Sequence, residues 1–453
     1  MIKRHIFLIL LVLMFYPLFV TTIIPDVLRT PFDTETIGRF IIPFQFQGND
    51  NIPWAVTESV QWDIFRPIYC LSILSDYVLW DTDARMYHVT DLLLSWVCYC
   101  LAFFLLKRQF GFLTAAIAVC LWTVHPSQCM SLLKIYGRND RLVTLFTIAA
   151  LFTYDMSFIK NEHRKLLFTL TLLFVILSTL SKDTGIFYCL LLPAWSILVK
   201  KRSIKETVKS DRMLWSGLLF LIVMFVVLRS IADFSIAIDS DGLNLGLNYF
   251  RLQSILIQMG FPLPPVWNLN PFAVCAITAL AVITAVFSRK CPGAIRFGAF
   301  SFSIFIFPFP FFWIQDSFLW GFWLWISLAM AGSAVYLFDK YVKNRNIVFK
   351  LLTFSVLIIV LSISAVWSIR VTRRISAPMI EMHEIAMYAV SSEEGPVYSE
   401  ENIFSRFPGW AHRMNHGPVE ERMKFSLYIV HMIRVETGIF ASTMNSPFIR
   451  ENW

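Results

Sequence analysis

Carboxylates follow the first hydrophobic segment of this 453-residue sequence. Asp26 comes directly after that segment, and Asp33 and Glu35 lie seven and nine residues beyond it. A positioned carboxylate can take a proton from an attacking hydroxyl group. A charge beside an apolar segment is also costly, so it tends to be kept for a use. We therefore take Asp26 as a candidate general base, with Asp33 or Glu35 in support.

A second set of candidates could hold an anion such as a phosphate. These residues lie in outer loops or at the outer ends of hydrophobic segments: Arg66, His125, Arg138, Asp140, Lys182 and Asp183. Arginine and lysine bind phosphate oxygens through charge-assisted hydrogen bonds, and a neighbouring aspartate can orient such a cation. The two sets together suit a reaction in which a hydroxyl group displaces a phosphate leaving group.

Each candidate also has a plainer interpretation. Asp26 can be a charge at a helix end, and Arg66 can extend its guanidinium to an interface. Asp140 can form a local ion pair with the arginines on either side of it. Lys182 can belong to a turn between helices, and a histidine such as His125 is more often structural than catalytic. The spacing of the whole set carries the argument.

The composition predicts an all-α polytopic membrane protein. The chain is 57% hydrophobic and 15% charged, with a mean hydropathy of +0.62, which a soluble protein of this size could not bury. Apolar runs predict about eleven transmembrane helices. They lie near 6–24, 89–106, 110–125, 142–158, 166–181, 186–199, 213–232, 271–288, 297–314, 318–338 and 347–368.

Positive charge predicts the orientation of these helices. Lysine and arginine fall in alternate loops, and all of those loops lie on the side of the N-terminus: Lys3-Arg4, Lys107-Arg108, Lys160 with Arg164-Lys165, Lys200 to Lys209, Arg289-Lys290 and Lys340 to Arg345. Such loops face the cytoplasm, so the N-terminus is predicted to be a cytoplasmic, uncleaved signal anchor and the C-terminus external. The net charge of +8 therefore orients helices and does not indicate nucleic acid as a partner.

Two segments outside the membrane stand out. The loop at 25–88 is long and is predicted to carry the active site, with a helix lying in the interface over 65–80. Residues 369–453 contain no long apolar run and are predicted to form a small external cap after a membrane domain at 1–368. No CxxC pair or metal-ligand spacing is found, so we expect no metal site and no required cofactor.

Several motifs of the chain resemble the GT-C-fold membrane glycosyltransferases. Phe65-Arg66-Pro67-Ile68-Tyr69, Leu74-Ser75-Asp76-Tyr77 and Tyr87-His88 through Leu94 resemble that group's FRPL…LDYxLxG…YHLxNLLLH stretch. His125-Pro126 with Gly137-Arg138-Asn139-Asp140 resembles its HPxHxEAVxWIxGRxDLL, and Ser181-Lys182-Asp183 its LLSKE. The pattern is most similar to bacterial members akin to the transmembrane and tetratricopeptide O-mannosyltransferases, and it covers residues 6–200.

The resemblance implies a GT-C fold, an inverting transfer and a sugar donor linked to polyprenyl or dolichyl phosphate. It also implies an active site on the outer face, and a divalent cation in some related folds. In this family an acidic pair follows the first span, and the alignment puts Asp26 on the first acid and Val27 on the second. Ser95 and Gln128 also depart from the family's pattern, so the chain is a divergent member of the group that it resembles.

The function that we expect is transfer of a hexose from a polyprenyl-phosphate donor to an envelope glycan such as O-antigen. The site would be the periplasmic side of a bacterial inner membrane, with membrane lipids and a glycan or lipid-linked acceptor as partners. Protein O-glycosylation by the same fold is an alternative. Two further alternatives are a non-catalytic membrane scaffold and a transporter of lipid-linked sugars. A transporter would place ionisable residues at mid-membrane.

Overall fold

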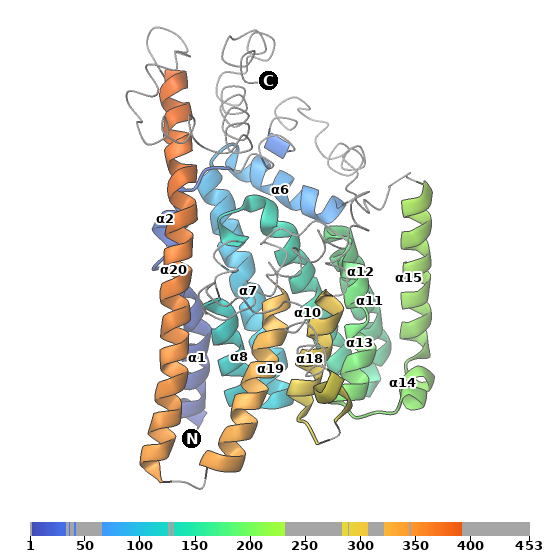
Figure 1. Cartoon of the computed structure of the whole chain (residues 1–453). Coiled ribbons are helices and arrows are strands. Elements are labelled where there is room, and N and C mark those ends of the chain that lie inside the picture. Colours follow the sequence, from blue (N-terminus) through green and yellow to red (C-terminus); the bar gives the residue numbers. More distant parts are fainter. Residues whose placement is uncertain are drawn as a thin grey trace, which may run out of the picture.

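A computed structural model describes residues 2–32, 36, 40–41, 66–125, 128, 131–231, 283–288, 290–306, 321–343 and 346–391. Every element within these ranges is helical, which confirms the all-α prediction for this part of the chain (Figure 1). Asp33 and Glu35 lie outside the described residues.

Six helices form the centre of the molecule. They are α7 (Ala84–Phe110), α8 (Phe112–Thr123), α10 (Arg138–Ser157), α11 (Arg164–Ser181), α18 (Gly293–Ile306) and α19 (Phe322–Leu337). α7 and α8 are separated by Gly111 alone, whose φ of +86° lets the chain reverse there without the backbone strain that a residue with a side chain would have at this angle. Consecutive long helices therefore pack side by side in the bundle.

Aromatic side chains fill the centre of this bundle. Phe297 of α18 packs edge-on against Trp195 and against Trp325 of α19, with ring centroids 4.8 and 5.5 Å apart. Gly298 lets α18 and α19 approach closely, because a Cβ at this position would lie 2.7 Å from the carbonyl oxygen of Trp325. Large rings thus fill the core beside a small residue that lets the backbones of α18 and α19 approach.

Shorter elements continue the chain around this centre, together with the 20-residue helix α15 (Arg212–Ile231). The shorter elements are η4 (Ile135–Gly137), η5 (Asn161–His163), α12 (Gly185–Tyr188), α13 (Leu191–Ala194), η6 (Trp195–Val199), α14 (Ile204–Ser210) and η10 (Phe338–Val342). The apolar helix α15 follows α14 after a bend of 85°.

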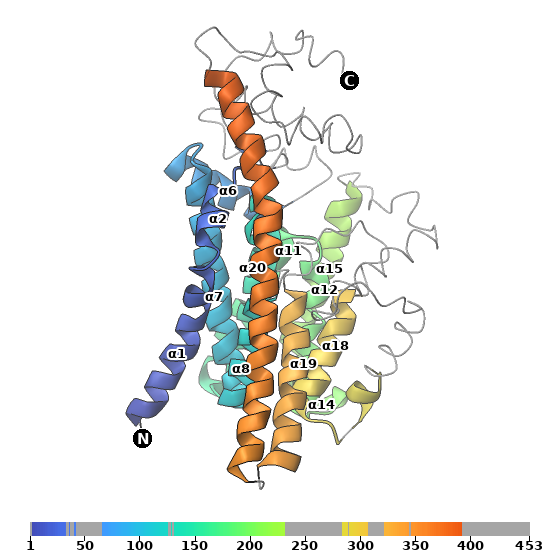
Figure 2. The same cartoon turned by 60° about the vertical axis from the view of Figure 1, so that its left-hand side comes forward.

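Four further helices cover the bundle. α1 (Ile2–Val20) and the short α2 (Ile24–Arg29) pack against α7, and α6 (Pro67–Trp80) lies across one end of α7, α10 and α11 (Figure 1). The long α20 (Ile347–Ser391) runs along the side of the bundle and extends beyond α6 (Figure 2). Ser364 and Ser368 of α20 both donate to the carbonyl of Val124, at 2.9 and 2.5 Å. We call the two ends of the molecule the α6 end and the α14 end.

Three helices are long and apolar enough to cross a membrane, namely Ala84–Phe110, Arg164–Ser181 and Ile347–Arg370, with a fourth if α14 and α15 count as one bent span. Other described helices lie where the sequence predicted spans but have only 10–17 residues, including Ile6–Val20 and Phe112–Thr123. The chain is therefore a helical membrane protein, and eleven crossings stay a prediction. α20 continues without a break across residue 368, where the predicted domain boundary lies.

Candidate functional site

The first feature of the α6 end is an arginine that joins three helices. Arg138 begins α10, and its guanidinium contacts Asp76 of α6 and Asp91 of α7, each at 2.6 Å. It also donates to the carbonyls of Ser72 and Tyr87, at 3.1 and 3.0 Å. All three charged side chains are buried, so removing either acid would leave charge uncompensated. Arg138 therefore orders the elements around the site and is enclosed by them.

Arg141 extends this network one turn along α10. Its guanidinium lies 3.1 Å from the second carboxylate oxygen of Asp91 and donates to the carbonyl of Ser131. The network of Asp76, Asp91, Arg138 and Arg141 contains equal numbers of positive and negative groups, which is the condition for burying charge at acceptable cost. It fixes α6 over the ends of α7 and α10.

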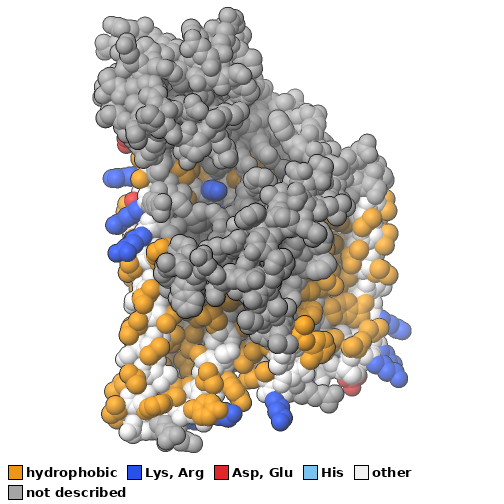
Figure 3. Space-filling view, viewed as in Figure 1, with side chains coloured by type: hydrophobic (Ala, Val, Ile, Leu, Met, Phe, Trp, Pro, Cys, Tyr) orange, Lys and Arg blue, Asp and Glu red, His pale blue; other side chains and the backbone are white. Residues whose placement is uncertain are grey.

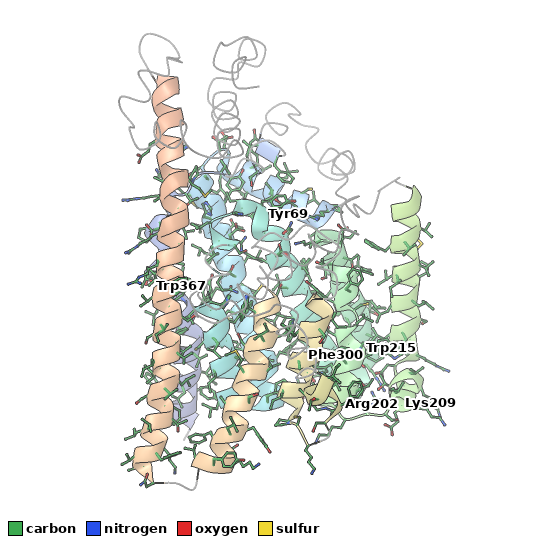
Figure 4. The ribbon with its side chains drawn as sticks, viewed as in Figure 1. Tyr69, Arg202, Lys209, Trp215, Phe300 and Trp367 are labelled. Carbon is green, nitrogen blue, oxygen red and sulfur yellow. The ribbon has the colours of Figure 1, made fainter. Side chains whose placement is uncertain are left out.

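A second charged cluster, which we call the Lys182 cluster, lies beside this network. Lys182 follows the last residue of α11, and its Nζ lies 2.6 Å from Asp140. Arg66 precedes α6, and its guanidinium lies 3.7 Å from Asp183 and donates to the Tyr136 hydroxyl at 3.4 Å. Asp140 interacts electrostatically with both Lys182 and Arg66, so the two ion pairs form one cluster. Figure 4 shows Tyr69, whose ring packs edge-on against Tyr136, at this end.

The two ion pairs of the Lys182 cluster differ in their access to solvent. The Lys182 side chain is 4% exposed, and burial lowers its pKa to about 8 although the nearby Asp140 opposes the change. Asp183 is 29% exposed, and its contact with Arg66 is the longer of the two. An incoming phosphate oxygen could therefore replace the Asp183 carboxylate as the partner of Arg66 while Asp140 keeps Lys182 in place.

Asp26 occupies a different setting on α2. Its carboxylate is partly exposed and lies 3.4 Å from Arg373 of α20, a residue that follows it by 347 positions in the chain. The next side chain, Val27, is 0% exposed and belongs to the hydrophobic core. An acid at position 27, as in the group that the sequence resembles, would thus meet an apolar environment in this chain.

Histidines complete the description of the predicted residues. His88 of α7 has one ring nitrogen 3.0 Å from the carbonyl of Thr30 and the other 3.1 Å from that of Leu132. It thereby links the segment after α2 to the segment before α10. His125 is buried and its ring stacks on Trp323 of α19 with centroids 3.4 Å apart, so its observed contact is with the bundle core.

The structure brings most of the predicted residues together. Arg66, Arg138, Asp140, Lys182 and Asp183 gather at the α6 end, whereas Asp26 pairs with α20 and His125 packs on α19. Within the described ranges no three histidine, cysteine or acidic side chains are placed to hold a metal ion, and the predicted independence from cofactors stays a prediction.

Sequence reasoning did not select Asp76, Asp91, Arg141, Tyr136 or Arg373. Asp91 had a signal, because it is an acid inside an apolar run and such a residue requires a partner. Asp76 lies within a motif that the sequence matched but was not given a role. Arg373 had no local signal, since only the fold places α20 beside α2.

Comparison with known proteins relates part of the chain to O-mannosyl-transferases. Protein O-mannosyl-transferase F38B6.6 of Caenorhabditis elegans is 34% identical over 127 residues, which are 27% of this chain and 17% of that protein. Protein O-mannosyl-transferase TMTC3 of Homo sapiens is 26% identical over 125 residues, which are 27% of this chain and 13% of that protein. The match thus spans less than a fifth of each relative. No protein-family model and no solved structure matches the chain.

Proposed function

We propose that the chain is a membrane glycosyltransferase whose sugar donor is linked to a polyprenyl or dolichyl phosphate. The observation that supports this most is the Lys182 cluster, in which Arg66 and Lys182 lie together at the end of a membrane bundle. The match to two O-mannosyl-transferases supports sugar transfer as the reaction class. A phosphate leaving group needs cationic donors, and arginine and lysine can supply them without a metal.

In the proposed reaction Asp26 is the general base. Its carboxylate takes the proton of the acceptor hydroxyl as the hydroxyl oxygen forms a bond to the anomeric carbon of the sugar. The bond between that carbon and the phosphate oxygen breaks at the same time, and the lipid phosphate leaves with the electron pair. Attack from the face opposite the leaving group inverts the anomeric centre. Arg373 must release Asp26 for this role, and their 3.4 Å contact is exposed enough to open.

The acceptor that the comparisons favour is a protein hydroxyl group. Both relatives are named as protein O-mannosyl-transferases, and both come from animals. The alternative acceptor, an envelope polysaccharide such as O-antigen at a bacterial inner membrane, draws no support from these relatives. We therefore place protein O-glycosylation first and a lipid-linked glycan second.

The test uses the purified protein in lipid vesicles with a radiolabelled polyprenyl-phosphate hexose. Peptides rich in serine and threonine serve as one acceptor and a lipid-linked glycan as the other. Replacing the general base, as in Asp26→Asn, is expected to slow transfer about 100-fold, the lower end of the usual effect of such a group. Asp33→Asn and Glu35→Gln are measured separately, and Asp81→Asn is the matched control, because Asp81 is an exposed acid at the same end.

Three results would count against the proposal. If all three acid variants transferred sugar at the full rate, the catalytic assignment of these carboxylates would fail. If the wild-type protein transferred no sugar to either acceptor but moved the labelled lipid across the vesicle membrane, a transporter would be favoured. If cells that lack the whole gene kept both sugar transfer and movement of the lipid across the membrane, a scaffold would be favoured.

A further inference from the structure

The α14 end carries a short helix whose orientation differs from that of the bundle. α14 meets α15 at 85°, and α15 is an apolar helix with exposed large side chains such as Leu219 and Phe220. If α15 crosses the bilayer, a helix at about a right angle to it lies in the plane of the membrane surface. α14 therefore lies where the headgroups of one leaflet would be.

One side of α14 is attached to the protein. Thr207 is buried, and its hydroxyl lies 2.9 Å from that of Ser196 while its carbonyl accepts from the indole of Trp215 at 3.1 Å. Ile204 and Val208 lie one turn apart on another side and are 68% and 56% exposed. At 3.6 residues per turn, Lys205 and Lys209 follow next around the helix. An apolar pair thus stands beside a pair of lysines, as in helices that lie in a membrane interface.

The acids near α14 are already engaged. Glu206 caps the helix, with its carboxylate accepting from the Ser203 backbone at 2.8 Å. Asp211 is buried and accepts from Tyr154 at 2.7 Å and Arg164 at 2.6 Å. Among the described residues, neither Glu206 nor Asp211 forms an ion pair with the exposed lysines of this segment.

Four cations remain at the surface of this segment. They are Lys201, Lys205, Lys209 and Arg212, all exposed and none with an ion pair to another described residue. Figure 3 shows lysine and arginine gathered at the lower right, over α14, and Figure 4 places Arg202, Lys209 and Trp215 at the same corner. We call α14 with these four cations the α14 surface.

We propose that the α14 surface binds the headgroups of anionic phospholipids in the leaflet that it faces. Ile204 and Val208 enter the boundary between headgroups and acyl chains, and the lysines reach the phosphates at headgroup depth. Clustered cations next to a membrane helix gain most from a negatively charged leaflet, which is that of the cytoplasmic side. The positive-inside pattern of the sequence puts the α14 end on that side.

This binding is separate from the proposed transfer reaction. α14 lies at the end of the molecule opposite α6, as Figure 1 shows, and the Lys182 cluster includes Arg66, which directly precedes α6. Its four cations contact none of the residues to which we assign transfer. A failure of the proposed function would therefore leave this inference untouched, and the reverse also holds.

The experiment measures lipid binding to the purified full chain in non-ionic detergent by native mass spectrometry. Phosphatidylglycerol and phosphatidylcholine are compared at matched concentrations. The test variant is Lys201→Gln with Lys205→Gln, Lys209→Gln and Arg212→Gln. The control variant removes four other exposed lysines at the same end: Lys160→Gln, Lys165→Gln, Lys340→Gln and Lys343→Gln. Thermal unfolding of each variant checks that the fold is kept.

The wild-type protein is expected to retain phosphatidylglycerol at least tenfold more tightly than phosphatidylcholine, since each cation near an anionic surface contributes about fivefold. The test variant should lose this preference and the control variant should keep it. Ile204→Ser with Val208→Ser should weaken binding of both lipids while the preference for phosphatidylglycerol remains.

Two results would overturn the inference. One is an equal loss of preference in the test and control variants, which would indicate non-specific attraction to the basic end. The other is complete displacement of phosphatidylglycerol by millimolar inorganic phosphate, which would show that the surface takes a soluble anion.

Discussion

Asp91 is the carboxylate whose removal should disturb the α6 end most. It is fully buried and contacts Arg138 at 2.6 Å and Arg141 at 3.1 Å. In Asp91→Asn, Arg138 keeps its ion pair with Asp76 at 2.6 Å. Arg141 loses the carboxylate with which it pairs among the described residues, so one cation, and not two, becomes buried without compensation.

The expected cost follows from that count. Leaving one member of a buried ion pair without its partner costs about 3–5 kcal/mol. The free energy of unfolding is measured from tryptophan fluorescence as sodium dodecyl sulfate is added to mixed micelles of the purified protein, which has 15 tryptophans. Asp81→Asn, an exposed acid three residues before α7, should change it by less than about 0.5 kcal/mol.

A double variant separates the lost pair from other effects of the substitution. Adding Arg141→Met to Asp91→Asn removes the stranded cation, and replacing both members of a buried ion pair by uncharged groups is often nearly neutral. The double variant should therefore be more stable than Asp91→Asn alone, by at least about 1 kcal/mol. If Asp91→Asn cost no more than Asp81→Asn, or if the two substitutions simply added, the assigned ion-pair network would be wrong.

Two further predictions concern the proposed site. If protonated Lys182 holds the donor phosphate, transfer should decline as pH rises through about 8, and Lys182→Arg should extend activity to higher pH. In the unfolded chain Lys182 keeps its proton up to a pKa of 10.5. Loss of the proton in the folded protein therefore raises its stability between about pH 8 and 10.5. A loss of folded protein that paralleled the loss of transfer activity would contradict this explanation. Val27→Asp should lower thermal stability far more than Val27→Ala, because it buries a carboxylate in the core; equal melting temperatures would show that the position tolerates the family's second acid.

The positions of helices could be predicted because their signal is local. The apolar runs near 89–106, 166–181 and 347–368 correspond to α7, α11 and the membrane part of α20. The shared location of Arg66, Arg138 and Lys182 could also be predicted, since alternate loops of a helical membrane protein meet at the same end. Neither prediction depends on which helices contact each other.

The pairing of charges could not be predicted in the same way. The sequence suggested a local pair between Asp140 and its arginine neighbours, but Asp140 contacts Lys182, 42 residues away. Arg138 instead pairs with acids on α6 and α7, and Arg373 reaches Asp26 from the far end of the chain. Such contacts depend on how helices pack, which periodicity and charge patterns do not specify.

Because α20 is long, a small tilt of this helix produces a large displacement at its end outside the membrane. Its 45 residues extend about 68 Å at 1.5 Å per residue, of which the apolar part, Ile347–Arg370, already exceeds the roughly 30 Å of hydrocarbon. A tilt of 10° about its contact at Ser364 would move Ser391 by about 7 Å and Arg373 by about 2 Å. A movement of this size directed away from α2 would break the 3.4 Å contact with Asp26, so a tilt of α20 in that direction would release the carboxylate.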